Sequence, residues 1–152
     1  MKNKHKNELG KFNEIWSRWQ PNTAVLDGNY HITKVDDNNK NFKIMLQHEH
    51  TMQQVEIIFA DLVLASRHVD EGLRFILFSE LSTKYGDDFY AQWAFFKVTN
   101  SEFLEWLSVY SGTVSDQLNL THFVIKGTDS LLDIVASYEP EIKIQPNKTK
   151  HA

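Results

Sequence analysis

Two histidines in the segment "QHEHTM", His48 and His50, have the spacing that most readily suggests metal binding. On a strand, side chains two residues apart point to the same face, so two imidazoles can share one metal ion. The local spacing supplies no third ligand, although His31 or Glu56 would come near across a hairpin. Two ligands do not close a site, and the segment lies at an expected turn. We therefore predict no metal site and no cofactor.

Acid–base and nucleophilic residues form no recognisable motif. His122, in "LTHFV", lies in an apolar run, and such a histidine is typical of a buried, hydrogen-bonded core residue. As a general base it would need a carboxylate partner within reach. No serine occupies a Gly-x-Ser-x-Gly elbow, the six glycines are scattered singly, and cysteine is absent. The sequence thus predicts no catalytic residue and favours a protein that is not an enzyme.

Four acidic residues and one tyrosine form the candidate binding site. Asp87 and Asp88, in "YGDDFY", precede an expected strand that contains Tyr90, and Glu102 and Glu105 lie on the outer side of the helix expected next. Acids beside partly exposed aromatic rings suit docking of a basic protein, with rings as anchors and acids as steering groups. The alternative is that the same residues form an ordinary solvated turn and helix face.

The distribution of charge also indicates a basic protein partner. The formal net charge is −4, from 16 Lys and Arg against 20 Asp and Glu. Five of the lysines lie in residues 1–6 and 146–152, which leaves 11 basic against 20 acidic residues and a charge of −9 on residues 7–145. An acidic body repels phosphate backbones, so we expect no nucleic-acid partner. The alternative is that the acidity only keeps the protein soluble.

The length of 152 residues suits one domain, expected over residues 1–145 with a basic, flexible stretch at 1–6. Residues 146–152 are expected to be a disordered tail. The N-terminus lacks the apolar segment of a secretory signal, and no apolar run has the length of a membrane span. The absence of cysteine fits a reducing cytoplasm. We expect a cytoplasmic protein, monomeric or homodimeric, without a membrane partner.

The apolar periodicity switches between two and 3.6 residues along the chain, which predicts the α+β class. Four consecutive strands are expected to form an antiparallel meander, and the region 73–78 is read as part of a helix, with a strand as the alternative. Strands are expected at 29–36, 41–48, 54–61, 61–70, 88–98, 120–127 and 141–144, and helices at 7–19, 70–86, 99–112 and 128–141. The expected fold is one domain with a mainly antiparallel sheet of about five to seven strands and helices packed mostly on one face.

The segment "YGDDFYAQWAFFKVTNSEFLEWL", residues 85–107, holds eight aromatic rings. Its first part is apolar on both faces if extended, so we expect a strand covered on both sides. Its second part begins with a capping box formed by Thr99 and Glu102, and the inner face of the helix is expected to be Phe103, Trp106, Leu107 and Tyr110. The rings are therefore predicted to fill the core. The alternative is a ring-lined pocket that binds a small ligand or serves an enzyme.

The segments "KYGDDFYAQWAFFKVTNSEFLEWL" and "LTHFVIKGTDSLLDIVASYEPEI" resemble small proteins of Gram-positive bacteria, some of which act as immunity proteins against polymorphic toxins. The resemblance covers roughly the C-terminal half and includes no catalytic motif, so it assigns no residue a role. It implies a cytoplasmic, non-enzymatic protein that binds and blocks a cognate toxin. Toxins that act on nucleic acid tend to be basic, which would match the acidic body of this chain.

Overall fold

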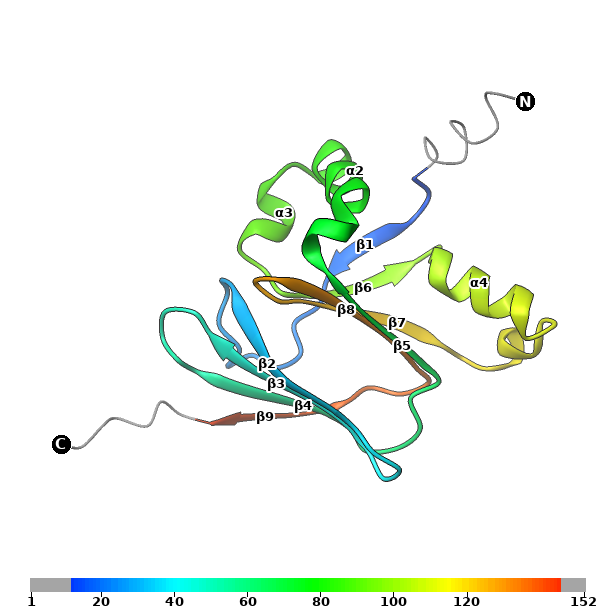
Figure 1. The fold of residues 1–152 in the computed structure, drawn as a ribbon, viewed down its shortest axis with the longest axis horizontal. Helices are drawn as coiled ribbons and strands as arrows, with labels where there is room; N and C mark the ends of the chain where they lie inside the picture. The colour runs from blue at the N-terminus through cyan, green and yellow to red at the C-terminus, as the bar shows by residue number, and fades with distance from the viewer. Residues whose placement is uncertain (1–11, 146–152) are drawn as a thin grey trace.

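Residues 12–145, the part of the chain that the computed structural model describes, form nine strands in two antiparallel sheets (Figure 1). The first sheet has the order β1-β6-β7-β8-β5, with β1 (Ile15–Arg18), β6 (Phe95–Thr99), β7 (Thr121–Lys126), β8 (Ser130–Ala136) and β5 (Ala65–Asp70). The second has the order β2-β3-β4-β9, with β2 (Tyr30–Asp37), β3 (Phe42–His48), β4 (Gln54–Phe59) and β9 (Glu141–Gln145). The helices are α2 (Phe75–Tyr85), α3 (Asp88–Ala91) and α4 (Glu102–Tyr110), with the 3-10 turns η1 (Glu71–Arg74) and η2 (Val114–Gln117).

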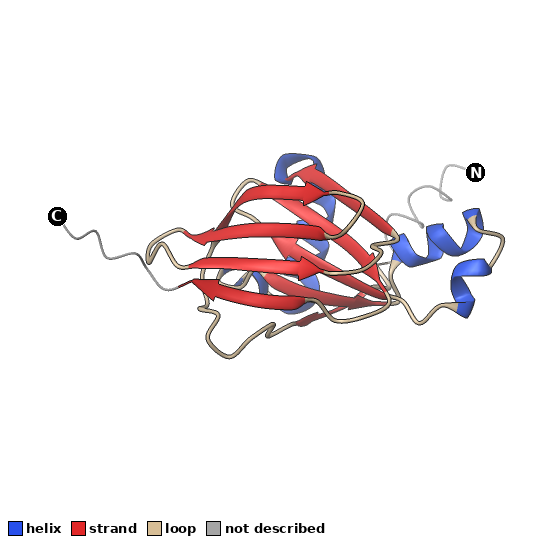
Figure 2. Cartoon of the chain, turned by 90° about the horizontal axis from the view of Figure 1, so that it is seen from below, coloured by secondary structure: helices blue, strands red, loops and turns tan. Residues whose placement is uncertain are grey.

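The two sheets lie face to face, and α2 and α3 lie over the outer face of the first sheet (Figures 1 and 2). The predicted α+β class, with antiparallel strands and helices mainly on one face, is confirmed. The nine strands exceed the expected five to seven because they divide between two sheets. In residues 12–145 no helix is long and apolar enough to cross a membrane.

The core between the sheets is built from aromatic rings. Phe95 lies 5.4 Å from Tyr30, and Phe59 lies 5.4 Å from Phe123, measured between ring centroids. Each pair joins one sheet to the other, because Phe95 and Phe123 lie on β6 and β7 while Tyr30 and Phe59 lie on β2 and β4. Most rings of residues 85–107 thus belong to the core or pack against it, as predicted. Trp93, Phe95 and Phe96 are buried in the core, and Tyr85, Phe89 and Tyr90 are partly buried against it.

The hairpin predicted in the first half of the chain is confirmed. β2 and β3 pair antiparallel, and the turn between them is closed by Asn38, whose side-chain oxygen accepts the N–H groups of Lys40 and Asn41. Alternate residues of β3 are buried, as the period of two predicts. The fourth strand of the expected meander is the exception: β5 pairs with β8 in the first sheet, and β9 takes the position beside β4.

The helix expected at 7–19 is wrong where the structure describes the chain. Residues 15–18 form β1, which pairs with β6, while residues 7–11 lie outside the described part. Trp16 is buried with its ring 5.6 Å from Phe96, and Trp19 packs 5.0 Å from Phe123. The two tryptophans are three residues apart, which fits one helix face. In this chain they instead lie on opposite faces of the first sheet, Trp16 beside Phe96 and Trp19 beside Phe123.

The helix expected at 128–141 is also wrong, since residues 130–136 form β8 between β7 and β5. Residues 131–136, "LLDIVA", are all buried, so the strand is covered on both faces. A short apolar run is typical of a buried strand and of a buried helix segment alike. Pairing with the neighbouring strands determines which of the two forms. This change of element places Asp133, a carboxylate, in the middle of the sheet.

The remaining elements follow the predictions with shifted boundaries. The region 73–78 lies in η1 and α2, so the strand alternative is wrong, and Gly86, with φ +86°, ends α2. The strand expected at 88–98 begins only at Phe95, because residues 88–91 form α3. The capping box of Thr99 and Glu102 is absent. Ser101 is the N-cap of α4, and its side chain accepts from the N–H of Leu104.

Candidate functional site

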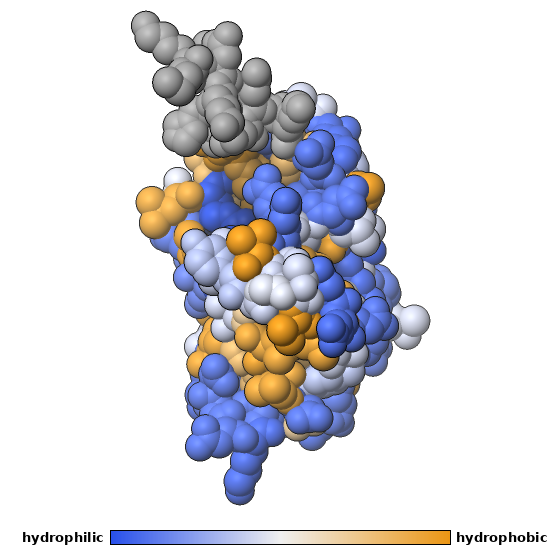
Figure 3. Space-filling model, turned by 90° about the vertical axis from the view of Figure 1, so that its right-hand side faces the viewer, coloured by the Kyte–Doolittle hydropathy of each residue, from blue (hydrophilic) through white to orange (hydrophobic). Residues whose placement is uncertain are grey.

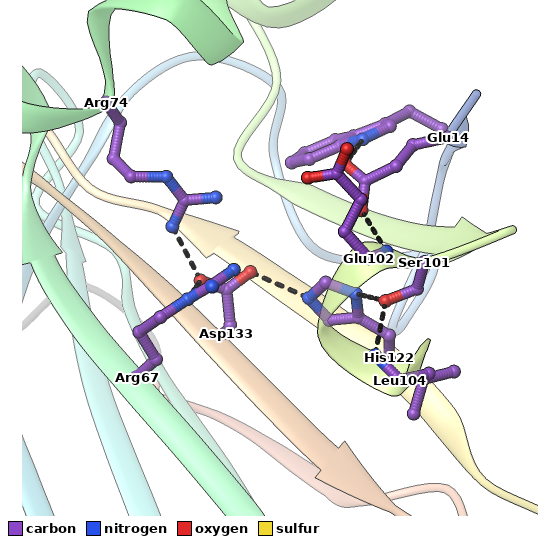
Figure 4. Close-up of polar contacts among 9 residues, drawn as sticks. Glu14, Arg67, Arg74, Ser101, Glu102, Leu104, His122 and Asp133 are labelled. Atoms are coloured by element: carbon purple, nitrogen blue, oxygen red, sulfur yellow. Dashed lines mark hydrogen bonds and ion pairs between the residues drawn. The ribbon is translucent and has the colours of Figure 1, made fainter. Parts of the chain in front are cut away.

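A group of polar side chains is buried where α4 meets the outer face of the first sheet (Figure 4). Asp133 of β8 is 0% exposed, and His122 of the neighbouring β7 is almost as deeply buried. Register brings Arg67 of β5 opposite Asp133, so three adjacent strands supply three of the side chains. Arg74 enters from η1 and Ser101 from the start of α4. Segments far apart in the sequence therefore converge on one carboxylate.

Asp133 is the centre of this group. One carboxylate oxygen, Oδ2, accepts hydrogen bonds from Nε of Arg67 at 2.9 Å and Nη1 of Arg74 at 2.7 Å. The other oxygen, Oδ1, contacts Nε2 of His122 at 2.7 Å. Burial by itself would raise the pKa of Asp133, but the hydrogen bonds from His122 and Arg67, with the charges of His122 and Arg74, hold that pKa well below its usual range. Asp133 is therefore an ionised carboxylate in the interior.

His122 connects this carboxylate to α4. Its Nδ1 lies 2.7 Å from Oγ of Ser101, and Oγ also accepts the backbone N–H of Leu104 at 3.1 Å. The ionised carboxylate of Asp133 can only accept, so Nε2 of His122 is the donor to it, and Nδ1 pairs with the Ser101 hydroxyl. Each polar atom then has a partner, and no buried side-chain nitrogen or oxygen within residues 12–145 is left without one.

A second buried carboxylate, Glu14, occupies the N-terminus of α4. Its Oε2 accepts the backbone N–H of Glu102 at 2.9 Å, and its Oε1 accepts the indole N–H of Trp16 at 3.1 Å. Burial, followed by the nearby charges of Glu14 and Glu105, raises the pKa of Glu102, although two arginines oppose the shift. An anion at this position is favourable because the first backbone N–H groups of a helix lack partners within it.

Hydrogen bonds connect Ser101 to His122 and His122 to Asp133, as in a serine-hydrolase triad, in which the histidine activates the hydroxyl. Three features oppose that chemistry. Two guanidinium groups already share the charge of Asp133, which weakens its support for an imidazolium. The hydroxyl of Ser101 is engaged as the helix cap, and the residue is only 6% exposed. The backbone N–H that would stabilise an oxyanion is occupied by Glu14. The arrangement is suited to fixing α4 rather than to acyl transfer.

Arg67 adds a cation–π contact to the same attachment. Its guanidinium carbon lies 4.4 Å from the ring centroid of Phe103, the buried residue of α4. The Phe103 ring also lies 5.7 Å from the imidazole of His122. Beyond this first turn α4 extends past the edge of the sheets, together with η2 (Figure 2). The network therefore anchors the start of a projecting helix.

The outer side of that helix carries large apolar side chains. Trp106 is 52% exposed, Val109 70% and Tyr110 75%, and the rings of Trp106 and Tyr110 lie 5.0 Å apart. Val114 and Leu118 of the following segment are exposed as well. Figure 3 looks onto this end of the molecule, where apolar residues gather in the middle of the view. Exposed apolar clusters on a folded chain mark interaction sites.

Acidic residues border this surface, and basic residues are missing from its sequence. Glu102 and Glu105 lie in the first turn of α4, and Asp116 lies in η2. Residues 98–121 contain no Lys, Arg or His. We call this surface the α4 face, and it consists of Glu102, Glu105, Trp106, Val109, Tyr110, Val114 and Asp116.

The structure separates the five predicted binding residues. Glu102 and Glu105 lie on α4, whereas Asp87 and Asp88 lie at the start of α3, on the far side of β6 (Figure 1). Tyr90 is half-buried in α3. The acids therefore do not form one patch. Only the two glutamates lie beside exposed rings.

The predicted inner face of α4 needs a correction. Phe103 is buried, but Trp106 and Tyr110 face outward. The signal was present in the sequence, since Glu102, Trp106 and Tyr110 follow one another at four-residue spacing and share a helix face. An outward Glu102 therefore implied an outward Trp106. His122 was correctly placed among buried, hydrogen-bonded residues, but its partner Asp133 was missed because the segment was read as a helix.

His48 organises a turn. Its Nε2 lies 2.8 Å from the carbonyl oxygen of Asp27, and its Nδ1 accepts the N–H groups of His50 and Thr51. Within residues 12–145 no group of three or more His, Asp or Glu residues is arranged to hold a metal ion.

Comparison of the chain with protein-family models, with curated proteins and with solved structures finds no significant match. The role of the chain is therefore inferred from its own residues.

Replacing Ser101 with alanine is expected to destabilise the protein by about 2 to 4 kcal/mol, because the helix loses its cap and the buried Nδ1 of His122 loses its partner. Urea unfolding followed by tryptophan fluorescence measures the change. Ser108→Ala is the matched control, since it makes the same substitution within α4, away from the network. A loss below about 0.5 kcal/mol, or labelling of Ser101 by a fluorophosphonate, would contradict the structural role.

Proposed function

We propose that this chain is a non-catalytic protein-binding module and that the α4 face receives a basic partner protein. The observation that carries the proposal is the exposure of Trp106, Val109 and Tyr110 on one projecting helix. Tryptophan and tyrosine are the residues that most often dominate binding energy at protein interfaces. An exposed apolar centre with a polar border is also the usual composition of such an interface.

The charge of the α4 face supports a basic partner. Glu102, Glu105 and Asp116 border the apolar centre, and residues 98–121 contain no positive side chain, although the charges of Arg67 and Arg74 reach Glu102. Acidic groups at the border of an interface accelerate association with a positively charged protein and disfavour acidic competitors. The same charge opposes nucleic acid, whose phosphates would meet three carboxylates.

The buried network supports the proposal through the rigidity that it gives to the α4 face. Ser101, Glu14 and Phe103 attach the first turn of α4 to the sheet. A binding surface that is already ordered loses less conformational entropy when its partner arrives. Apolar residues of the same volume often stabilise an interior as well as a buried ionic network does, so we infer that the value of the network here is to set the position of the helix.

An immunity-type inhibitor is the biological role that we propose for this module. A protein of this kind would bind a basic toxin in the cytoplasm and block its active surface without performing chemistry. The acidic α4 face and the charge of −9 on residues 7–145 support that role. So does the resemblance of the C-terminal half to small Gram-positive proteins that include toxin antagonists.

The test is direct binding to the product of the adjacent gene, the protein that an immunity protein would be encoded beside. Calorimetry with the two purified proteins is expected to show a tight complex whose affinity falls as salt is raised, because charge contributes to the encounter. Co-expression of the chain is expected to restore growth to cells that make the neighbouring protein. Absence of both binding and rescue would exclude the immunity role.

A further inference from the structure

A depression lies on the helix-covered side of the first sheet, away from the α4 face. Its volume is about 610 Å³, and it opens to solvent beside η1, α2 and α3. β7 starts at the end of the sheet that carries α4, so the turn after β7, which contributes Asp129, lies at the opposite end (Figure 1). The lining residues are Asp70, Glu71, Gly72, Phe75, Phe78, Tyr90 and Asp129, which we call the η1 groove.

Aromatic rings form the apolar part of the η1 groove. Phe75 is 74% exposed at the first position of α2. Phe78 packs against Tyr90 with 5.1 Å between ring centroids, and the hydroxyl of Tyr90 lies 2.7 Å from Oγ of Ser82, which fixes the ring. The face of an aromatic ring carries negative potential and attracts a cation placed over it.

Carboxylates form the polar part of the η1 groove. The backbone N–H of Glu71 donates to the carbonyl oxygen of Asp129, so the two residues that carry the free acids are held together. Among residues 12–145, the side chains of Glu71 and Asp129 form no hydrogen bond or ion pair with another side chain, and the lining of the groove contains no Lys, Arg or His. Asp70 is already occupied, since its Oδ1 accepts the N–H of Gly72.

Two cations close to η1, Arg74 and Lys126, are engaged elsewhere and leave this charge largely uncompensated. Arg74 is bound to Asp133 on the inner side of η1. Lys126 is buried, and burial lowers its pKa while Glu71 and Glu49 partly restore it. Its ammonium group lies 3.4 Å from the side-chain oxygen of Asn29, directed at the second sheet. The groove therefore presents rings and acidic groups together, with its own cation turned away.

We propose that the η1 groove binds an arginine side chain of the basic partner protein. A planar guanidinium stacks on a ring and donates paired hydrogen bonds to a carboxylate, and Phe75 offers the ring while Glu71 and Asp129 offer the carboxylates. The identity of the partner rests on the proposed function. Recognition of an arginine side chain at this groove does not depend on the α4 face.

The test is a titration of the ¹⁵N-labelled full chain with Nα-acetyl-L-arginine amide, followed by NMR. Saturable shifts are expected for the amides of Gly72, Phe75 and Asp129. Nα-acetyl-L-citrulline amide has the same shape without the charge, and its affinity is expected to be about fivefold lower. Nα-acetyl-L-lysine amide distinguishes a guanidinium site from a general cation site, and equal binding of the lysine compound would overturn the choice of arginine.

Variants localise the effect. Glu71→Gln combined with Asp129→Asn is expected to weaken arginine-amide binding about fivefold. Phe75→Leu, which keeps an apolar side chain and removes the ring, is expected to weaken it about twofold to fivefold. The control combines Glu105→Gln and Asp116→Asn, which removes two charges from the α4 face and is expected to leave this binding unchanged. Shifts outside the groove, or unchanged binding by the groove variants, would overturn the proposal.

The adjacent-gene product separates this proposal from the proposed function. If it binds the chain and the groove variants retain that affinity, the groove has no part in the interface and the function stands. If the arginine amide binds the groove while the neighbouring protein does not bind the chain, the groove stands and the proposed partner is wrong.

Discussion

Replacing Asp133 with asparagine is expected to lower the free energy of unfolding by about 3 to 5 kcal/mol. The side chain is fully buried and pairs with Arg67, Arg74 and His122 at 2.7 to 2.9 Å. Asparagine has nearly the same shape but no charge, so the largely buried Arg74 and the partly exposed Arg67 lose their shared counter-ion, and His122 loses its charged acceptor. A loss of this size is a large part of the stability of a typical domain, which is about 5 to 15 kcal/mol.

Urea unfolding at neutral pH, followed by tryptophan fluorescence and by circular dichroism, measures this loss. The matched control is Asp129→Asn, which makes the same substitution on an exposed residue in the turn between β7 and β8. That control is expected to change stability by less than about 0.5 kcal/mol. Equal stabilities of the two variants would show that the carboxylate of Asp133 does not hold the network together.

The contribution of Asp133 is also expected to depend on pH. Its pKa in the folded chain lies below the ordinary value of 3.8, so the folded state favours the ionised form. The stabilisation is fully present well above that value and is lost as the pH falls through it, toward the lower folded pKa. The stability difference between the original chain and Asp133→Asn should therefore be largest at neutral pH and should shrink below about pH 4. A difference that stays constant from pH 7 to pH 3 would contradict this assignment.

Loss of the rings on the α4 face is expected to weaken partner binding strongly without loss of stability. Trp106 and Tyr110 are exposed, and their rings lie 5.0 Å apart at a tilt of 42°, so together they form the centre of the proposed interface. Truncating one interface hot spot typically costs about 2 kcal/mol or more, which is roughly thirtyfold in affinity. The double variant Trp106→Ala and Tyr110→Ala is therefore expected to weaken the complex with the adjacent-gene product by at least about a hundredfold.

Calorimetry measures the affinity, and thermal unfolding checks that the double variant is folded. Leu73→Ala is the matched control, because this exposed leucine lies on η1 and outside both proposed surfaces. It is expected to bind as the original chain does. A double variant that keeps its affinity would place the interface elsewhere on the molecule, and a double variant that unfolds early would mean that the rings serve the fold.

The sequence was sufficient to predict elements whose signals are local. The alternation in β3 and the Asn-rich turn before it depend on residues within one hairpin, and both are confirmed. The helix that ends at Gly86 and the one that ends near Gly112 also follow from nearby residues. The errors occurred at β1 and β8, where short apolar runs fit a helix or a strand equally well.

The part of the candidate site that depends on local spacing was also predicted correctly. Glu102 and Glu105 were placed on the outside of a helix from local spacing alone, and that position is confirmed. The exposure of Trp106 depends on how far α4 extends beyond the sheet, which no local pattern reports. Asp87 and Asp88 were grouped with the glutamates because they are close in sequence, and the intervening strand β6 separates them.

By itself, the sequence determined the class of the fold, the acidity of the body and the position of most rings between residues 85 and 107 in the core or against it. Each of these follows from composition and short-range periodicity, which are properties of the chain before it folds. The tertiary structure alone decided that β8 lies between β7 and β5, and therefore that Asp133 meets His122, Arg67 and Arg74. Ion pairs between residues about 60 positions apart depend on strand order, and strand order is set by how the sheets pack.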